Sequence, residues 1–230
     1  RRFKVLLNLE KDPFDTYEEI FSFHESPNRK PVFFFLLGDY GRFDKNLHFS
    51  NQNYQSLIKA LADYSPIGIH PSYNSSRING RLQLETDRLA QIIRRPVTKS
   101  RQHFLKLRLP HTYRNLLSAD LREDYTMGYA NHTGFRAGTC SPFMFYDLDL
   151  ETETKLKVYP FAVMDGTLHD YLKLSPAKAM ETINNLIEEV KNVKGTFISL
   201  WHNESLSEWR GWTGWREVYA HLVEKATEKQ

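Results

Sequence analysis

The chain has 230 residues, of which 40% are hydrophobic and 13% aromatic, so it can bury a sizeable core and is not an intrinsically disordered protein. Its 31 basic and 28 acidic residues are interspersed and leave a net charge of only +3, which excludes the concentrated basic face of a nucleic-acid-binding protein. The single cysteine, Cys140, excludes an intrachain disulfide and a cysteine-rich zinc site.

The sequence shows no targeting or membrane segment. No apolar run approaches the ~18 residues of a membrane span, and the first apolar run is too short for a signal peptide. We therefore expect a protein without a membrane span, and the cytoplasm is slightly favoured as its compartment. The chain starts with two arginines and no methionine, so we expect that part of the protein lies upstream.

Hydrophobic periodicity predicts strands and helices in alternation along the chain. Helical spacing predicts helices at residues 12–25, 51–65, 77–95, 111–121, 175–195 and 214–229. Short apolar runs predict strands at residues 30–41, 66–71, 97–107, 123–130, 134–139, 155–165 and 196–205. Such alternation indicates parallel strands with helices outside, in a single domain over residues 1–230.

The helix at 175–195 has the clearest boundary signals. Ser175 is the expected N-cap, Pro176 occupies the first helical position, and Gly195 is the expected C-cap.

Histidines mark the ends of two predicted strands. His70 follows "IGI" and His202 follows "FISLW", and parallel strands bring their carboxyl ends to one face of a sheet. His103 alternates with Arg101 in the strand between them, so both side chains are expected to point the same way. We expect His70, Arg101 and His202 to converge, although a hydrogen-bonded structural role for each histidine stays open.

Other polar residues add candidates at loops and strand ends. Asp165 interrupts an apolar run in "FAVMDGT", and Arg136 lies among small residues in "GFRAGT", where a ligand contact and a structural ion pair are equally open. Asp39 and Asp44 flank "YGRF" and could line the same face after the "FFFLL" strand, although a solvated loop is the favoured interpretation.

Seven ordered segments resemble the NodB-homology polysaccharide deacetylases, especially a divergent bacterial branch. These segments are "VFFFLLG", "IGIHPSY", "RQHFLKLRLPHTYRNL", "DYTMGY", "GFRAGT", "PFAVMDGTL" and "FISLWHN", and the resemblance runs from about residue 12 to about residue 220. It implies a distorted, incomplete (β/α) barrel, with the first strand missing from this chain, and removal of N- or O-acetyl groups from sugars with one divalent metal.

The resemblance also assigns roles by position. His70 matches the first metal-binding histidine, Arg101 the arginine that orients the catalytic carboxylate, and His202 the late histidine that acts as general acid. Asn74 stands where the second metal-binding histidine is usual, so His103 would supply the missing imidazole. The Asp-rich opening motif of the family has no match here, and it lies upstream of Arg1 or is absent.

The expected function is therefore deacetylation of an acetylated carbohydrate with one divalent metal, for which zinc is the first choice. With Asn74 at a ligand position and the Asp-rich motif absent, this chain is expected to bind zinc weakly or not at all. Tyr73, Tyr129 and Trp201 would offer flat faces to sugar rings. Asn74, Arg136 and Asp165 would complete the substrate contacts. One alternative is a degenerate member that binds glycan without hydrolysing it, which Asn74 favours. A glycoside hydrolase with Asp165 and Glu204 as its carboxylate pair is a further alternative.

Overall fold

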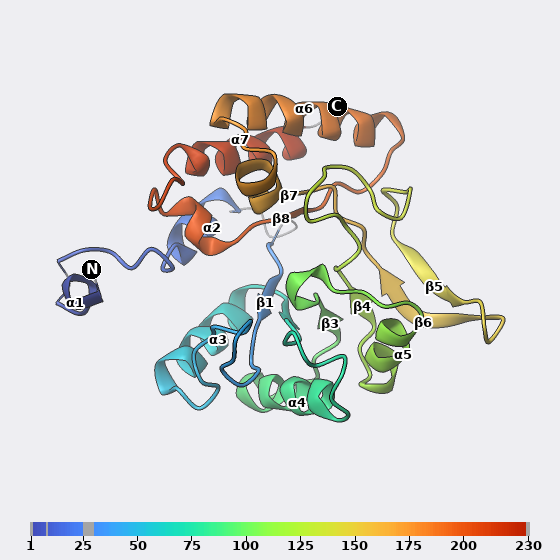
Figure 1. The fold of residues 1–230 in the computed structure, drawn as a ribbon. Helices are drawn as coiled ribbons and strands as arrows, with labels where there is room; N and C mark the ends of the chain where they lie inside the picture. Colours follow the sequence, from blue (N-terminus) through green and yellow to red (C-terminus); the bar gives the residue numbers. More distant parts are fainter. Residues whose placement is uncertain (1, 8, 25–29, 229–230) are drawn as a thin grey trace. The chain divides into compact units, whose positions relative to one another are not determined.

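The computed structural model describes residues 2–7, 9–24 and 30–228 (Figure 1). The chain forms two compact units. The sheet unit comprises residues 30–128 and 135–161, and the two-strand unit comprises residues 1–29, 129–134 and 162–230. Each is described by itself.

The sheet unit is built on a mostly parallel sheet. Within the described residues its strand order is β1, β2, β3, β4, β6, β5. The strands are β1 (Phe33–Phe35), β2 (Ile67–Ile69), β3 (Lys99–Ser100), β4 (Glu123–Asp124), β5 (Phe143–Asp147) and β6 (Thr152–Val158). Among the strands of the described residues, only β5, at the edge, runs antiparallel to its neighbour.

Three helices connect the consecutive strands β1 to β4. They are α3 (Gln52–Tyr64), α4 (Arg81–Ile93) and α5 (His111–Ser118), and Figure 1 shows them outside the strands. Because the strands follow one another in both chain and sheet order, right-handed crossovers place all three helices on the same face. The sequence predicted all three of these helices, with boundaries that differ from the observed ones by up to four residues.

Local chemistry explains how these elements form. The Asn51 side chain caps α3 by accepting a hydrogen bond from the Tyr54 N–H at 3.0 Å. Gly68 in β2 is required by close packing, since a Cβ there would lie 2.5 Å from the Phe34 ring and 2.9 Å from the Lys99 carbonyl oxygen. Position 68 is therefore too crowded for any residue with a side chain.

The strands predicted at 30–41, 123–130 and 196–205 are shorter than expected, since β1, β4 and β8 (Ser199–Leu200) span only two or three residues each. Three other strand predictions need a larger correction. The predicted strand at 97–107 ends at Ser100, and residues 103–105 form a short 3-10 turn in which Phe104 and Leu105 have left-handed backbones. Residues 134–139 form no strand, because Gly134 and Gly138 both adopt positive φ. The predicted strand at 155–165 is divided between β6 and β7 (Val163–Met164), and the β5–β6 hairpin was not predicted.

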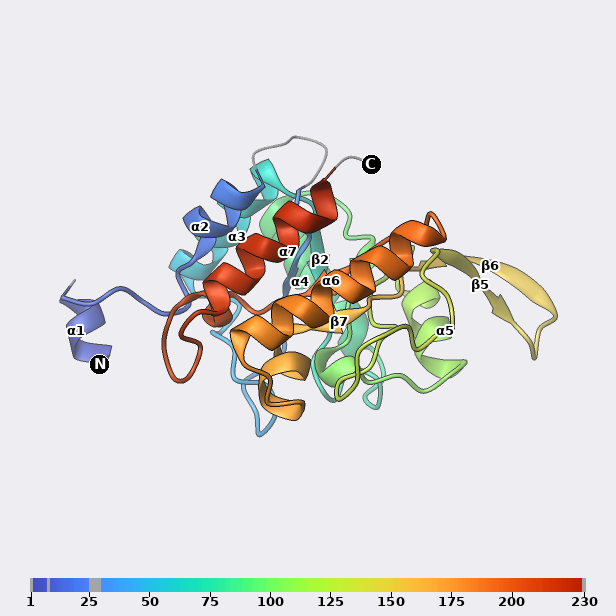
Figure 2. The ribbon, with the colours of Figure 1, turned by 90° about the horizontal axis from the view of Figure 1, so that it is seen from above.

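The two-strand unit contains one βαβ arrangement. Strands β7 and β8 (Ser199–Leu200) pair in parallel, with Val163 opposite Ser199 and Met164 opposite Leu200. Helix α6 (Pro176–Asn192) connects them, and Figures 1 and 2 both show α7 (Trp215–Thr227) beside α6. Two shorter helices precede them in the chain, α1 (Arg2–Leu6) and α2 (Tyr17–Phe23).

The predicted start of α6 is confirmed, and its predicted end is wrong. The Ser175 side chain accepts a hydrogen bond from the Lys178 N–H, with Pro176 at the first helical position. At the other end Val193 is the cap and Lys194 takes the left-handed backbone, so Gly195 lies beyond the position that glycine usually fills.

The observed fold class is mixed α/β with a parallel sheet and helices. None of the helices in the described ranges is both long and apolar enough to cross a bilayer.

Candidate functional site

Loops that follow β1, β2 and β3 bring the polar residues of the sheet unit together. The three strands are parallel, so the loops that follow them leave the sheet at the same edge. The loop after β1 carries Asp44, the loop after β2 carries His70 and Tyr73, and the loop after β3 carries His103.

His70 is held by the backbone of the neighbouring strand. Its Nδ1 lies 2.5 Å from the Arg101 carbonyl oxygen, and its backbone N–H donates to the Phe35 carbonyl at 2.8 Å. Because a carbonyl oxygen can only accept, Nδ1 must carry the proton in this contact. In the neutral ring, Nε2 then carries the lone pair.

His103 is held by a carboxylate in the same manner. Its Nδ1 lies 2.8 Å from Asp44 Oδ1, and Asp44 also accepts a hydrogen bond from the Tyr73 N–H at 3.0 Å. The ring centroids of His70 and His103 are 4.9 Å apart. We call His70 and His103 the imidazole pair: two neighbouring rings, each with Nδ1 against an acceptor.

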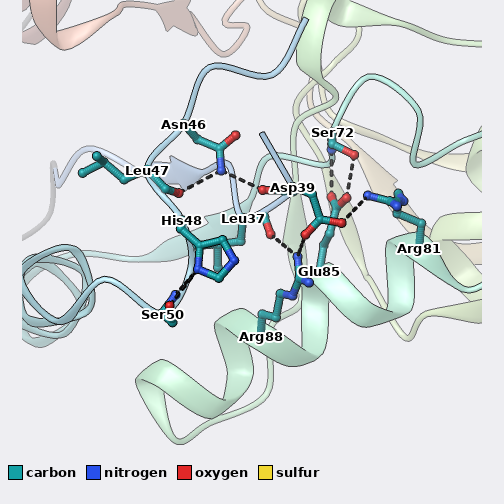
Figure 3. Close-up of polar contacts among 11 residues, drawn as sticks. Leu37, Asp39, Asn46, Leu47, His48, Ser50, Ser72, Arg81, Glu85 and Arg88 are labelled. Atoms are coloured by element: carbon teal, nitrogen blue, oxygen red, sulfur yellow. Dashed lines mark hydrogen bonds and ion pairs between the residues drawn. The ribbon is translucent and has the colours of Figure 1, made fainter. Parts of the chain in front are cut away.

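The loop that carries Asp44, residues 38–50, is fixed to helix α4 by an ionic network (Figure 3). Asp39 contacts Arg81 and Arg88 at 3.0 Å each, and Arg88 also donates to the Leu37 carbonyl at 2.8 Å. Burial would raise the pKa of the Asp39 carboxyl, but the two guanidinium groups hold that pKa below its usual range. Asn46 closes the loop by donating to the Gly38 carbonyl at 2.7 Å.

The loop that carries His70 is fixed by a buried glutamate (Figure 3). Glu85 of α4 accepts hydrogen bonds from the Ser72 N–H at 2.8 Å and the Ser72 hydroxyl at 2.5 Å. Burial raises the pKa of the Glu85 carboxyl, against the effect of these donors. Gly38 is needed here, because a Cβ would lie 2.5 Å from Ser72 Cβ.

Arg101, expected to orient a catalytic carboxylate, lies among aromatic rings of the sheet unit. Its guanidinium lies 4.7 Å from the centroid of the Phe34 ring, and its Nε–H donates to the Tyr125 carbonyl at 3.0 Å. A fully buried carboxyl, Asp124, is close enough to feel this charge. Burial raises the pKa of Asp124, and hydrogen bonds from Thr126 and the Arg101 charge oppose that rise.

In the two-strand unit, His202 is paired with Asp165. The His202 Nδ1 lies 2.8 Å from Asp165 Oδ1, and its backbone N–H donates to Oδ2 at 2.7 Å. The Asp165 side chain is fully buried, whereas the His202 side chain is 55% exposed. Burial would raise the pKa of Asp165, but the charge of His202 and hydrogen bonds from His202 and Ser205 hold it below its usual range.

The remaining predicted site residues have varied surroundings. Trp201 is half-buried, and its ring packs edge-on against Tyr219 with centroids 5.1 Å apart. Asn74 and Arg136 are exposed residues of the sheet unit. Tyr73 is half-buried, with the Phe43 ring centroid at 4.2 Å and Lys106 Nζ at 4.0 Å from its own.

Two groupings follow from these contacts. The structure brings His70 and His103 together, and separately joins His202 to Asp165. The expected convergence of His70 and Arg101 with His202 stays a prediction, because these residues belong to different units. Across residues 2–7, 9–24 and 30–228, no group of three or more His, Cys, Asp or Glu side chains has a metal-binding arrangement.

Sequence reasoning did not select Asp44 or Glu85 as site residues. Asp44 was assigned to a solvated loop, yet it is buried and contacts His103. The available signal was its place in the loop after an apolar strand. Glu85 is a buried acid within the apolar spacing of α4, and that spacing gave no sign of its partner Ser72.

The comparisons with known proteins point to a fold. No protein-family model and no curated protein sequence matches the chain. Among solved structures it is similar to the "Crystal structure of putative polysaccharide deacetylase from Mycobacterium smegmatis", with a TM-score of 0.61 and 15% sequence identity over 92% of this chain and 71% of that one. At this identity the likeness shows a shared fold, consistent with the parallel sheet and helices described above.

Proposed function

We propose that this protein is a carbohydrate deacetylase with a distorted (β/α)-barrel fold. The observation that carries the proposal is the imidazole pair at the carboxyl edge of the parallel sheet, with both Nδ1 atoms engaged. The similarity to a structure described as a polysaccharide deacetylase supports the same reaction class. The resemblance of the ordered sequence segments supports it further.

The imidazole pair has the donor chemistry of a partial zinc site. Zinc takes imidazole nitrogens as ligands, and metal-binding histidines usually donate their other N–H to a carbonyl or a carboxylate. His70 and His103 make these two contacts, so we propose them as ligands and leave the further protein ligand unassigned. A bound divalent metal would polarise an acetyl carbonyl and lower the pKa of a water molecule toward ~7.

His202 is the proposed general acid. Asp165 holds the ring at Nδ1, so the proton that moves to the leaving sugar nitrogen or oxygen is the one on Nε2. The fully buried Asp165 acts as a positioning residue for His202 and does not itself contact substrate. Its contacts with His202 also argue against its use in the carboxylate pair of a glycoside hydrolase.

The test measures acetate release and zinc binding on the same preparations of the full chain. Acetylated oligosaccharides serve as substrates, and isothermal titration calorimetry measures zinc affinity. We expect His103→Ala to lower both zinc affinity and acetate release, and His202→Asn to lower acetate release while zinc affinity is kept. His132→Ala is the control, since His132 is exposed and hydrogen-bonds its neighbour Asn131.

Two outcomes would overturn the proposal. Wild-type acetate release by the His103 and His202 variants would remove both residues from the reaction. Glycan binding without any acetate release would instead favour the non-catalytic member of the fold. The exposed Asn74, at the position where the family resemblance places a histidine, is the observation that favours that second candidate.

A further inference from the structure

Three aromatic rings form a partly exposed cluster beside the imidazole pair. Phe43, Tyr73 and Phe104 come from the loops after β1, β2 and β3, with ring centroids 4.2 Å apart for Phe43–Tyr73, 5.5 Å for Tyr73–Phe104 and 6.0 Å for Phe43–Phe104. The Phe104 ring also lies 4.5 Å from the His103 ring. Phe43 is 39% exposed and Phe104 is 58% exposed. We call these three residues the aromatic platform.

The backbone at Phe104 has an unfavourable conformation, and the ring of this residue is exposed. Phe104 has φ 58° and ψ 20°, and the following Leu105 has φ 51°. The left-handed region is unfavourable for a bulky residue. Leu105 is buried while Phe104 is exposed, so burial of the Phe104 ring does not offset this cost. Strain of this kind is typical of ligand-binding positions.

Cationic side chains surround the platform. Arg42 lies over the Phe43 ring at 5.4 Å, and Lys106 lies over the Tyr73 ring at 4.0 Å while donating to the Tyr73 carbonyl at 3.0 Å. The pKa of Lys106 is lowered by burial and by the charge of Arg77, and Asp44 opposes this. Within the described ranges Arg42, Arg77 and Lys106 form no salt bridge, whereas Asp39 is paired with two arginines (Figure 3).

We propose that the aromatic platform binds a sugar unit of an acidic glycan. The exposed rings of Phe43 and Phe104 would pack against the apolar face of the sugar, and Tyr73 supports them from below the surface. The unpaired charges of Arg42 and Lys106 would bind an anionic group on the same unit, a carboxylate or a sulfate. This inference rests on the proposed function and names its substrate class.

The cationic side chains and the exposed rings together favour an acidic sugar over a neutral one. A neutral glycan would use the rings and leave the cations without a counter-ion, which desolvation on binding would penalise. The platform is adjacent to His103, so a bound sugar would place its substituents beside the imidazole pair. An acidic peptide would satisfy the cations equally well, and the experiment includes it as a competitor.

The experiment measures binding to the full chain by isothermal titration calorimetry at low and at raised salt. The ligands are an oligogalacturonide, a sulfated oligosaccharide, a neutral chito-oligosaccharide of equal length and an acidic peptide. We expect at least one anionic sugar to bind about tenfold more tightly than the neutral one, with the preference reduced by salt. The two anionic sugars distinguish carboxylate from sulfate recognition.

Two variants separate the rings from the charge. Phe104→Gly should relieve the left-handed strain, so its melting temperature should equal or exceed that of the wild type while its affinity for anionic and neutral sugars falls about tenfold. Lys106→Met should remove the preference for anionic sugars and keep neutral binding. Tyr64→Ala and Lys59→Met are the controls, at exposed positions of α3.

The outcomes distinguish this inference from the proposed function. Equal binding of anionic and neutral sugars, unchanged affinity in Phe104→Gly, or tighter binding of the acidic peptide would overturn the platform. Acetate release with no anionic preference would keep the deacetylase and overturn the platform. Anionic binding that is lost in Phe104→Gly, in a protein that releases no acetate, would keep the platform and overturn the deacetylase.

Discussion

The two units each contain a carboxylate–imidazole pair, and the pairs are built differently. In both, a histidine Nδ1 lies 2.8 Å from an aspartate Oδ1. Asp165 directly follows β7, and His202 lies two positions after the end of β8, which pairs with β7. Asp44 and His103 are joined by loops, and the loop of Asp44 depends on the Asp39 network for its position.

This difference separates a pair fixed by sheet register from a pair fixed by side chains. The pairing of Met164 with Leu200 places Asp165 close to the residues that follow β8. The His202 backbone N–H also donates a hydrogen bond to Asp165. Asp44 has no such backbone link to His103, although it binds the Tyr73 N–H. We therefore expect the Asp165–His202 pair to tolerate distant substitutions and the Asp44–His103 pair to be sensitive to them.

The largest expected effect is that of His202→Asn on turnover. The asparagine Nδ2 can replace Nδ1 as the donor to Asp165, so the fold is kept and the transferable proton is lost. Acetate release should fall about 10²- to 10⁴-fold. His202→Ala should in addition lower the free energy of unfolding by about 2 kcal/mol, because the buried carboxylate loses a donor. Equal urea denaturation curves for both variants would contradict the pairing.

The second effect is on acid stability. The pKa of Asp165 is lower in the folded chain than in the unfolded one, so its contribution to stability is present above the unfolded pKa of ~3.9 and is lost as pH falls through the folded pKa. Asp165→Asn should therefore be less stable than wild type by about 2 kcal/mol at pH 7, with this difference narrowing as pH falls below ~3.9. Urea denaturation of both proteins between pH 7 and low pH measures this stability difference, with Asp120→Asn at an exposed position as the control. A stability difference that persists at low pH would be inconsistent with an ionic role for Asp165.

A smaller effect tests the loop-built pair. Arg88→Met removes the donor to Leu37 and one partner of Asp39, and should cost about 1 kcal/mol of stability. Backbone amides of residues 38–50 should exchange faster with solvent, and acetate release should fall through displacement of Asp44. Arg122→Met removes a more exposed ion pair and should change neither amide exchange in residues 38–50 nor acetate release. Unchanged exchange in Arg88→Met would show that the network does not hold the loop.

The smallest expected effect is that of Glu85→Gln. The pKa of Glu85 is raised in the fold, so its ionisation lowers stability as pH rises from the unfolded pKa of ~4.3 through the folded pKa. A glutamine oxygen can still accept from the Ser72 N–H, and its amide can donate to the Ser72 hydroxyl. Stability at pH 7 should stay within about 1 kcal/mol of wild type, with a flatter pH dependence; a large loss would mean that Glu85 is needed as an anion.

The sequence alone determined the features that depend on local pattern. Helical spacing located α3, α4, α6 and α7, and Ser175 with Pro176 marked the start of α6. The change from apolar to polar residues at strand ends selected His70, His202 and Asp165 before their partners were known. Periodicity and caps act over a few neighbouring residues, which is why a single sequence reveals them.

The tertiary structure alone decided the features that depend on distant partners. Asp44 and His103 are 59 positions apart in the chain and contact each other in the fold, and no local sequence pattern predicts that contact. The strand predicted at 97–107 ends at Ser100, before the turn in which Phe104 is left-handed, and the β5–β6 hairpin was not predicted. Loop conformation and strand pairing are set by the sum of many long-range contacts, so they appear only when the chain is folded.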